Sequence, residues 1–206
     1  MQLYNLTSTF MNMELYIEIL GTAVGLIYLW LEYKASIYLW IAGIIMPAIY
    51  LYIYYNAGLY ADFGINIYYL VIALYGFIAW KTGFSFTKRH KESKELHITH
   101  ISTKEIYKAL TAYIIAQIAI AWLLINHTDS TVPLADSFTT ALSIVGMWML
   151  ARKYIEQWWV WCVVDVASSA LYIYKELYFT SILYLLYAII AIFGYFKWKK
   201  MMQNEG

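Results

Sequence analysis

The sequence contains little charge. Only 13% of its 206 residues are Asp, Glu, Lys or Arg, whereas a soluble domain usually has about 25%. The net charge of +1 leaves no basic excess for binding nucleic acid. Cysteine occurs once, at Cys162, which excludes an intramolecular disulfide and a cysteine zinc site. The phosphate-binding pattern GxxxxGK[ST] is absent. These shortages exclude a cytosolic enzyme, a disordered protein and a nucleic-acid binder.

Long apolar stretches are abundant, and hydrophobic residues make up 63% of the chain. A membrane-spanning helix needs about 20 mostly apolar residues. The stretches that meet this length recur throughout the chain and are separated by short polar breaks. The predicted spans are residues 13–32, 36–55, 62–80, 106–126, 133–151, 155–174 and 177–196. We therefore predict an all-α polytopic membrane protein with seven transmembrane helices.

The basic residues indicate how the helices are oriented. Every Lys and Arg except Lys175 falls on one side of the predicted membrane. Because positive residues concentrate on the cytoplasmic side, we expect the N-terminus outside and the C-terminus in the cytoplasm. The longest polar break, residues 81–104, is then a basic cytoplasmic loop.

Two segments of the sequence repeat. Leu51-Tyr-Ile-Tyr54 recurs at residues 171–174, an offset of 120, and Tyr75-Gly-Phe with Trp80-Lys81 is echoed at residues 193–199, an offset of 118. A two-residue deletion in an outer loop would reconcile the offsets. The repeat predicts two three-helix bundles, residues 13–80 and 133–197, joined by a linking helix at 105–126. Transporters built from parallel repeats bind substrate between the repeats, near the middle of the membrane.

Asp165 is predicted to lie halfway along its span, where a carboxylate costs roughly 2.5–3.5 kcal/mol to insert. No basic residue is predicted at the same depth. Trp158, Trp161 and Asp165 share one helical face, and Ser168, Ser169 and Tyr172 extend it. Two indoles beside a carboxylate suit a flat, cationic, aromatic ligand. The alternative is an interfacial aromatic girdle with an aspartate bonded to Ser or Tyr of a neighbouring helix.

The pattern Trp158-x-x-Trp161-x-x-x-Asp165 resembles the WxxWxxxN motif of the Pnu family of bacterial vitamin transporters. Residues 134–143, 150–158 and 183–198 are similar to the C-terminal half of that family, and residues 59–66 with Tyr75-Gly76 to its third core helix. The resemblance implies a 3+1+3 fold similar to SWEET sugar carriers, placed in the bacterial inner membrane. It also implies facilitated diffusion of a vitamin without a cofactor, with trapping by a cytoplasmic vitamin kinase.

Asp165 stands where the motif usually has Asn, and the Asp version resembles the thiamine-transporting branch. A carboxylate can accept hydrogen bonds from an aminopyrimidine, whereas an amide suits a carboxamide partner. We therefore predict thiamine as substrate; nicotinamide riboside and riboflavin are the alternatives within the family.

Further substrate contacts are predicted from other helices. The family usually has a polar amide at Asn66, and Asn66 with Tyr69 would reach the substrate from the first bundle. Tyr184 and Tyr187 are candidates on the last span. For Asn66 and the two tyrosines, helix packing is the alternative role.

The sequence disfavours two other functional classes, an intramembrane enzyme and an ion channel. An intramembrane enzyme would need a second buried acid, base or metal ligand beside Asp165, and the sequence offers none in the inner halves of the predicted spans. An ion channel would need charges repeated by symmetry, whereas Ile45 matches Asp165 at an offset of 120. We predict no catalytic residue and no metal site. The predicted partners are the vitamin and the lipid bilayer, and a homo-oligomer is left open.

Overall fold

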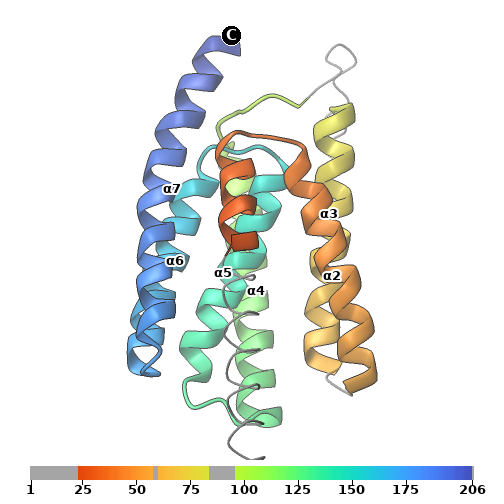
Figure 1. Ribbon diagram of the computed structural model, residues 1–206, viewed down its shortest axis with the longest axis vertical. Helices are drawn as coiled ribbons and strands as arrows, with labels where there is room; N and C mark the ends of the chain where they lie inside the picture. Colours follow the sequence, from red (N-terminus) through yellow and green to blue (C-terminus); the bar gives the residue numbers. More distant parts are fainter. Residues whose placement is uncertain (1–22, 58–59, 84–95, 206) are drawn as a thin grey trace, which may run out of the picture.

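The computed structural model describes residues 23–57, 60–83 and 96–205, and in this part the chain is all-helical (Figure 1). The first described helix is Ala23–Tyr33. It is followed by α2 (Tyr38–Ala57), α3 (Tyr60–Thr82), α4 (Thr103–His127), α5 (Pro133–Ala151), α6 (Gln157–Tyr174) and α7 (Tyr178–Glu205). The predicted fold class is confirmed. Residues 13–22 of the first predicted span lie outside the described residues.

The predicted spans match these helices closely, with one difference in length. The helix α7 continues past the predicted end at residue 196, because Lys197, Lys199 and Lys200 prolong it beyond its apolar part. By length and composition, four described helices can cross a membrane: Phe63–Thr82, Thr103–His127, Pro133–Ala151 and Tyr178–Asn204. The helix α6 is not one of these four, and it contains Gln157, Asp165, Ser168 and Ser169.

A single offset of 118 relates the two halves. The helix Ala23–Tyr33 ends 118 positions before α5 ends, and α3 begins 118 positions before α7 begins. Ala35 (φ 49°) and Lys153 (φ 51°), also 118 apart, both adopt the left-handed conformation where the chain turns into the next helix. The predicted two-residue deletion is therefore unnecessary. In this register Asp165 corresponds to Pro47 and not to Ile45.

The first repeat consists of Ala23–Tyr33, α2 and α3, and the second of α5, α6 and α7. In each repeat a tryptophan of the second helix packs on a glycine of the third. A Cβ atom at Gly76 would lie 2.5 Å from the Trp40 ring, and one at Gly194 would lie 2.6 Å from the Trp158 ring. Only glycine allows such close approach.

Trp80 and Trp198 complete this packing, also at an offset of 118. Ring centroids lie 5.5 Å apart for Trp40 and Trp80, 6.2 Å for Trp80 and Trp198, and 5.7 Å for Trp158 and Trp198. All four side chains are buried. We call Trp40, Trp80, Trp158 and Trp198 the tryptophan layer.

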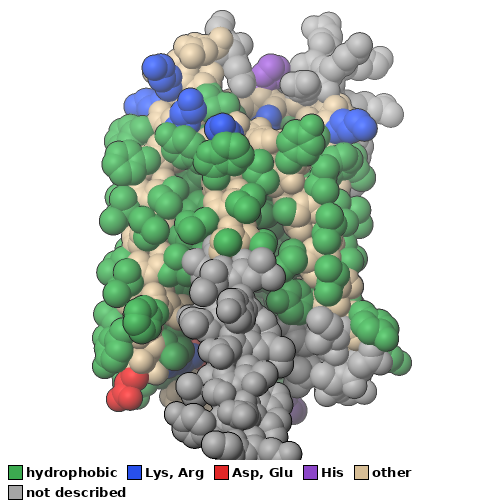
Figure 2. All heavy atoms as spheres, in the orientation of Figure 1, with side chains coloured by type: hydrophobic (Ala, Val, Ile, Leu, Met, Phe, Trp, Pro, Cys, Tyr) green, Lys and Arg blue, Asp and Glu red, His purple; other side chains and the backbone are tan. Residues whose placement is uncertain are grey.

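Two reciprocal hydrogen bonds join the repeats at this layer. Trp80 Nε1 donates to the Leu150 carbonyl across 3.3 Å, and Trp198 Nε1 donates to the Glu32 carbonyl across 3.0 Å. The two donors are 118 positions apart, and so are the two acceptors. Each repeat therefore donates a hydrogen bond to the end of the first helix of the other repeat. Figure 2 shows Lys and Arg gathered at one end of the molecule, which we call the basic end. The tryptophan layer lies toward this end.

Residues 96–102 are attached to the turn between α5 and α6. Thr99 forms an isolated parallel bridge with Tyr154, and Lys153 Nζ donates to the Leu96 carbonyl across 2.8 Å. His100 Nδ1 lies 2.6 Å from Glu156 Oε1. The helix α4 packs on α5. The described part of the connection between the repeats therefore contacts the second repeat.

Candidate functional site

A cavity of about 630 Å³ lies between the two repeats, and we call it the central cavity. Its lining comes from Ala23–Tyr33, α2 and α3 on one side and from α5, α6 and α7 on the other. Trp158 contributes to both the lining and the tryptophan layer, so the cavity adjoins that layer. This position between parallel repeats is the one predicted for a substrate.

The predicted face of α6 points into the central cavity. Trp158, Trp161 and Asp165 all line it. Asp165 is only 7% exposed, and the structure gives it no hydrogen bond or ion pair to another described residue. No Lys, Arg or His is among the described lining residues. Within the described chain Asp165 is thus neither bonded to a neighbouring Ser or Tyr nor neutralised by a base.

The two tryptophans of the motif have different surroundings. The Trp158 ring packs against Gly194 and Trp198 and is almost fully buried. Trp161 packs on α5, where a Cβ atom at Gly146 would lie 3.3 Å from its ring, and it stays partly accessible. Neither indole N–H has a hydrogen-bond partner among the described residues. Trp161 therefore has the freer surface for stacking, while Trp158 also belongs to the packing.

Three predicted tyrosines also reach the central cavity: Tyr69 from α3 and Tyr184 with Tyr187 from α7. Tyr184 contacts Tyr172 and Tyr187, with ring centroids 5.1 and 5.7 Å apart. The Tyr187 hydroxyl lies 2.8 Å from where a Cβ atom of Gly25 would stand. Tyr187 thus crosses from the second repeat to the first and forms part of the cavity wall.

Two predicted residues do not line the central cavity. The Ser169 hydroxyl lies 2.8 Å from the Ser181 hydroxyl and donates to the Ser181 carbonyl across 3.0 Å. It therefore joins α6 to α7. Asn66 is absent from the lining, although Tyr69 one turn later is present. The structure does not bring the predicted amide to the cavity.

Glu32 lines the central cavity, and the sequence did not point to it. It stands beside Lys34 at the end of a predicted span, a position typical of solvated interface residues. In the structure it is 3% exposed. The expectation that no second buried acid accompanies Asp165 is therefore not met. The repeat contained the missed signal, because in the 118 register Glu32 corresponds to Leu150, which is fully buried.

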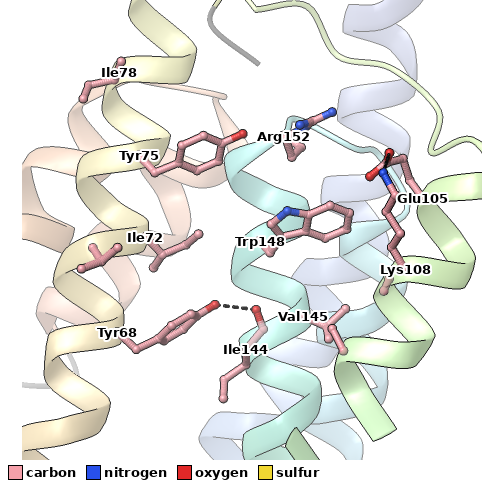
Figure 3. A pocket seen from close by; sticks show the side chains of 13 residues that line it. Tyr68, Ile72, Tyr75, Ile78, Glu105, Lys108, Ile144, Val145, Trp148 and Arg152 are labelled. Atoms are coloured by element: carbon pink, nitrogen blue, oxygen red, sulfur yellow. Dashed lines mark hydrogen bonds and ion pairs between the residues drawn. The ribbon is translucent and has the colours of Figure 1, made fainter. Parts of the chain in front are cut away.

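A second cavity of about 740 Å³ lies between α3, α4 and α5 (Figure 3). Its lining is mainly apolar, and its acid is already paired, since Lys108 Nζ lies 2.8 Å from Glu105 Oε1. The Tyr68 hydroxyl donates a hydrogen bond to the Ile144 carbonyl across 2.7 Å. The central cavity, with its unpaired Asp165, is therefore the candidate substrate site.

A protein-family model described as nicotinamide mononucleotide transporter matches residues 15–200. The chain belongs to this family. The predicted membership of the Pnu transporters is thereby confirmed, while the thiamine branch is not. The matched range includes the linking helix, every described residue that lines the central cavity, and both repeats except the last turn of α7.

Several named transporters are similar to this chain in sequence. The nicotinamide riboside transporter PnuC of Escherichia coli is 22% identical, over 93% of this chain and 88% of that protein. PnuC of Neisseria mucosa is also 22% identical, over 71% of this chain but only 57% of that protein. The riboflavin/roseoflavin transporter RibM of Streptomyces davaonensis is 25% identical over 63% of this chain and 59% of its own length.

The fold also matches a solved structure of the family. A crystal structure of the vitamin B3 transporter PnuC has a TM-score of 0.64 and 21% identity, and the match covers 90% of this chain and 81% of that one. The likeness shows the fold.

Proposed function

We propose that this protein carries a cationic, aromatic B-vitamin across the bacterial inner membrane. The observation that carries the proposal is Asp165, which has no partner within the described chain and lies in a cavity between two repeats with no basic residue in its described lining. The charge of the vitamin neutralises this carboxylate, and Trp161 supplies a stacking surface. The remaining faces of the substrate are enclosed by four aromatic side chains: Trp158, Tyr69, Tyr184 and Tyr187.

The substrate we propose is thiamine, with nicotinamide riboside as the second candidate. The named relatives favour nicotinamide riboside, and none of those described above is named for thiamine. However, relatives at 22–25% identity are named for different vitamins, so such identity does not fix the substrate. Both candidates are cationic rings. Asp165 favours thiamine, because a carboxylate can also accept hydrogen bonds from the aminopyrimidine.

The mechanism we propose is facilitated diffusion by relative movement of the two repeats. The tryptophan layer fills the space between the repeats at the basic end, so opening that end requires both indole hydrogen bonds to break. With the positive side in the cytoplasm, the described conformation is closed toward the cytoplasm. Substrate shifts the populations of the two states only by its difference in affinity for them. Phosphorylation by a cytoplasmic kinase then traps the vitamin.

Uptake by proteoliposomes tests this function. We expect purified protein to take up labelled thiamine down its gradient in the absence of any ion gradient. Unlabelled thiamine on the opposite side should accelerate this uptake, because a carrier returns faster when loaded, whereas a channel shows no acceleration. Uptake of nicotinamide riboside with no uptake of thiamine would reject thiamine and retain the function. Uptake of neither vitamin would reject the function.

A further inference from the structure

Glu32 is a buried acid that the proposed transport mechanism has not yet used. Its side chain lines the central cavity and is 3% exposed. Its Oε1 atom is fully buried and has no hydrogen-bond partner among the described residues. A buried polar atom without a partner is unfavourable, and each such atom in a native structure calls for an explanation, such as a functional role or a bound water or ion.

Gln157 repeats this situation from the other side of the interface. It lies close enough to interact with Glu32 and is 0% exposed. Neither its Oε1 nor its Nε2 has a partner with hydrogen-bond geometry in the described chain. Glu32 belongs to the first repeat and Gln157 to the second. Two adjacent polar side chains with unused bonding capacity thus meet where the repeats face each other.

The hydrogen bond from Trp198 does not use the carboxylate of Glu32. The residue's structural bond is made by its backbone carbonyl, which accepts from Trp198 Nε1. The equivalent bond in the other half is accepted by the carbonyl of Leu150, an aliphatic residue that is fully buried. A leucine therefore suffices where only packing and the backbone bond are required. The carboxylate of Glu32 therefore has a role other than this packing, and Leu150 in the second repeat does not have that role.

We propose that Glu32 forms a second subsite of the central cavity, which accepts a hydrogen bond from an amino or hydroxyl group of the vitamin. This inference rests on the proposed function. Asp165 balances the cationic ring, and Glu32 selects a substrate with a hydrogen-bond donor at a distance from that ring. Thiamine offers an amino group and a hydroxyl group, and nicotinamide riboside offers ribose hydroxyls and a carboxamide. Gln157 lies beside this carboxylate on the second repeat.

The test measures vitamin binding to purified full-length protein by calorimetry. E32Q keeps the shape of the side chain and removes its charge. We expect it to weaken binding about 10- to 100-fold, the range for a hydrogen bond to a charged group. Glu32→Leu installs the residue of the second repeat, keeps the backbone bond, and should weaken binding at least as much. Glu105→Gln is the matched control, because Glu105 is also buried but lies outside the central cavity; its affinity should equal that of the wild type.

Vitamin analogues separate direct contact from an indirect effect. For thiamine we use one analogue without the amino group and one without the hydroxyl group. If Glu32 accepts from one of them, the analogue lacking that group binds wild type and E32Q equally. An equal loss with thiamine and both analogues would overturn the proposal, as would E32Q affinity within twofold of the wild type. A sodium-dependent affinity that E32Q abolishes, with the sodium-free affinity unchanged, would also overturn it, because Glu32 would then bind a cation. If the wild type binds neither vitamin, the proposed function fails together with this inference.

Discussion

The two repeats have the same aromatic packing at the basic end but different residues around the central cavity. The packing residues are identical at an offset of 118: Trp40 and Trp158, Gly76 and Gly194, and Trp80 and Trp198. Each tryptophan–glycine contact and each indole hydrogen bond occurs once per repeat. Identical residues in both halves are what a symmetric contact between two similar bundles requires.

Most cavity residues do not follow this symmetry, although Tyr69 and Tyr187, which both line the central cavity, are equivalent at an offset of 118. The unequal pairs are Pro47 and Asp165, Gly43 and Trp161, and Glu32 and Leu150. At one equivalent contact, the aromatic residue and the glycine have changed places. In the second repeat Trp161 of α6 packs on Gly146 of α5, whereas in the first repeat Tyr28 of the first helix packs near Gly43 of α2. The comparison indicates that the shared tryptophans and glycines hold the repeats together, while the unequal residues make the central cavity asymmetric.

The largest effect on stability is expected from shortening the third-helix tryptophans. Trp80→Ala and Trp198→Ala each remove a buried ring and a bond between the repeats. Each should cost about 3–5 kcal/mol, and the two costs should be similar because the sites are equivalent. Unfolding of detergent-solubilised protein measures this. Trp122→Ala is the control, since Trp122 is 60% exposed on α4. A large loss at only one of the two sites would break the proposed equivalence.

A smaller loss of stability is expected from the shared glycines. Gly76→Ala and Gly194→Ala place a methyl group 2.5–2.6 Å from an indole ring, and overpacking of this kind costs about 1–3 kcal/mol. Gly64→Ala serves as the control, because nothing lies within 4 Å of its added Cβ. The same unfolding measurement applies. Wild-type stability for both variants would show that the tryptophan rings can move away without cost.

The smallest effect on stability, with a clear effect on binding, is expected at Asp165. Asp165→Asn removes an unpaired buried charge, so the unfolding temperature should not fall. Thiamine affinity should fall about tenfold or more, because the counter-charge of the cationic ring is lost. Calorimetry with thiamine and nicotinamide riboside measures both affinities. Unchanged thiamine affinity would reject the role assigned to Asp165, and a gain for nicotinamide riboside would support the specificity argument.

The sequence alone predicted the helices and the α6 face of the site. Apolar length fixes where helices cross a membrane, and the 3.6-residue period places Trp158, Trp161 and Asp165 together whatever surrounds them. The repeat was also detectable, but a second match at an offset of 120 suggested a deletion that the structure does not contain. Aromatic-rich helices produce such coincidences, and only the positions of helix ends distinguish them.

Residues whose role depends on neighbouring helices were not predictable in the same way. Ser169 and Asn66 have suitable chemistry and suitable depth. Ser169 nevertheless faces Ser181 on α7. Asn66 does not line the cavity, although Tyr69, one helical turn later, does. Glu32 was overlooked because its surroundings along the chain are those of a membrane interface. Whether such a residue reaches the cavity depends on how its helix is rotated about its own axis and on which distant helix it packs against.

The linking helix α4 is attached to the second repeat, so the two halves of the protein differ in size. In sequence, α4 is the midpoint of a 3+1+3 arrangement, but among the helices labelled in Figure 1 it packs only on α5. Residues 96–102 are also fastened to the turn after α5. If the repeats move as proposed, we therefore expect α4 to move with the second repeat. The distance between fluorescent probes on α4 and α3 should then change during the proposed movement, whereas the distance between probes on α4 and α5 should stay constant.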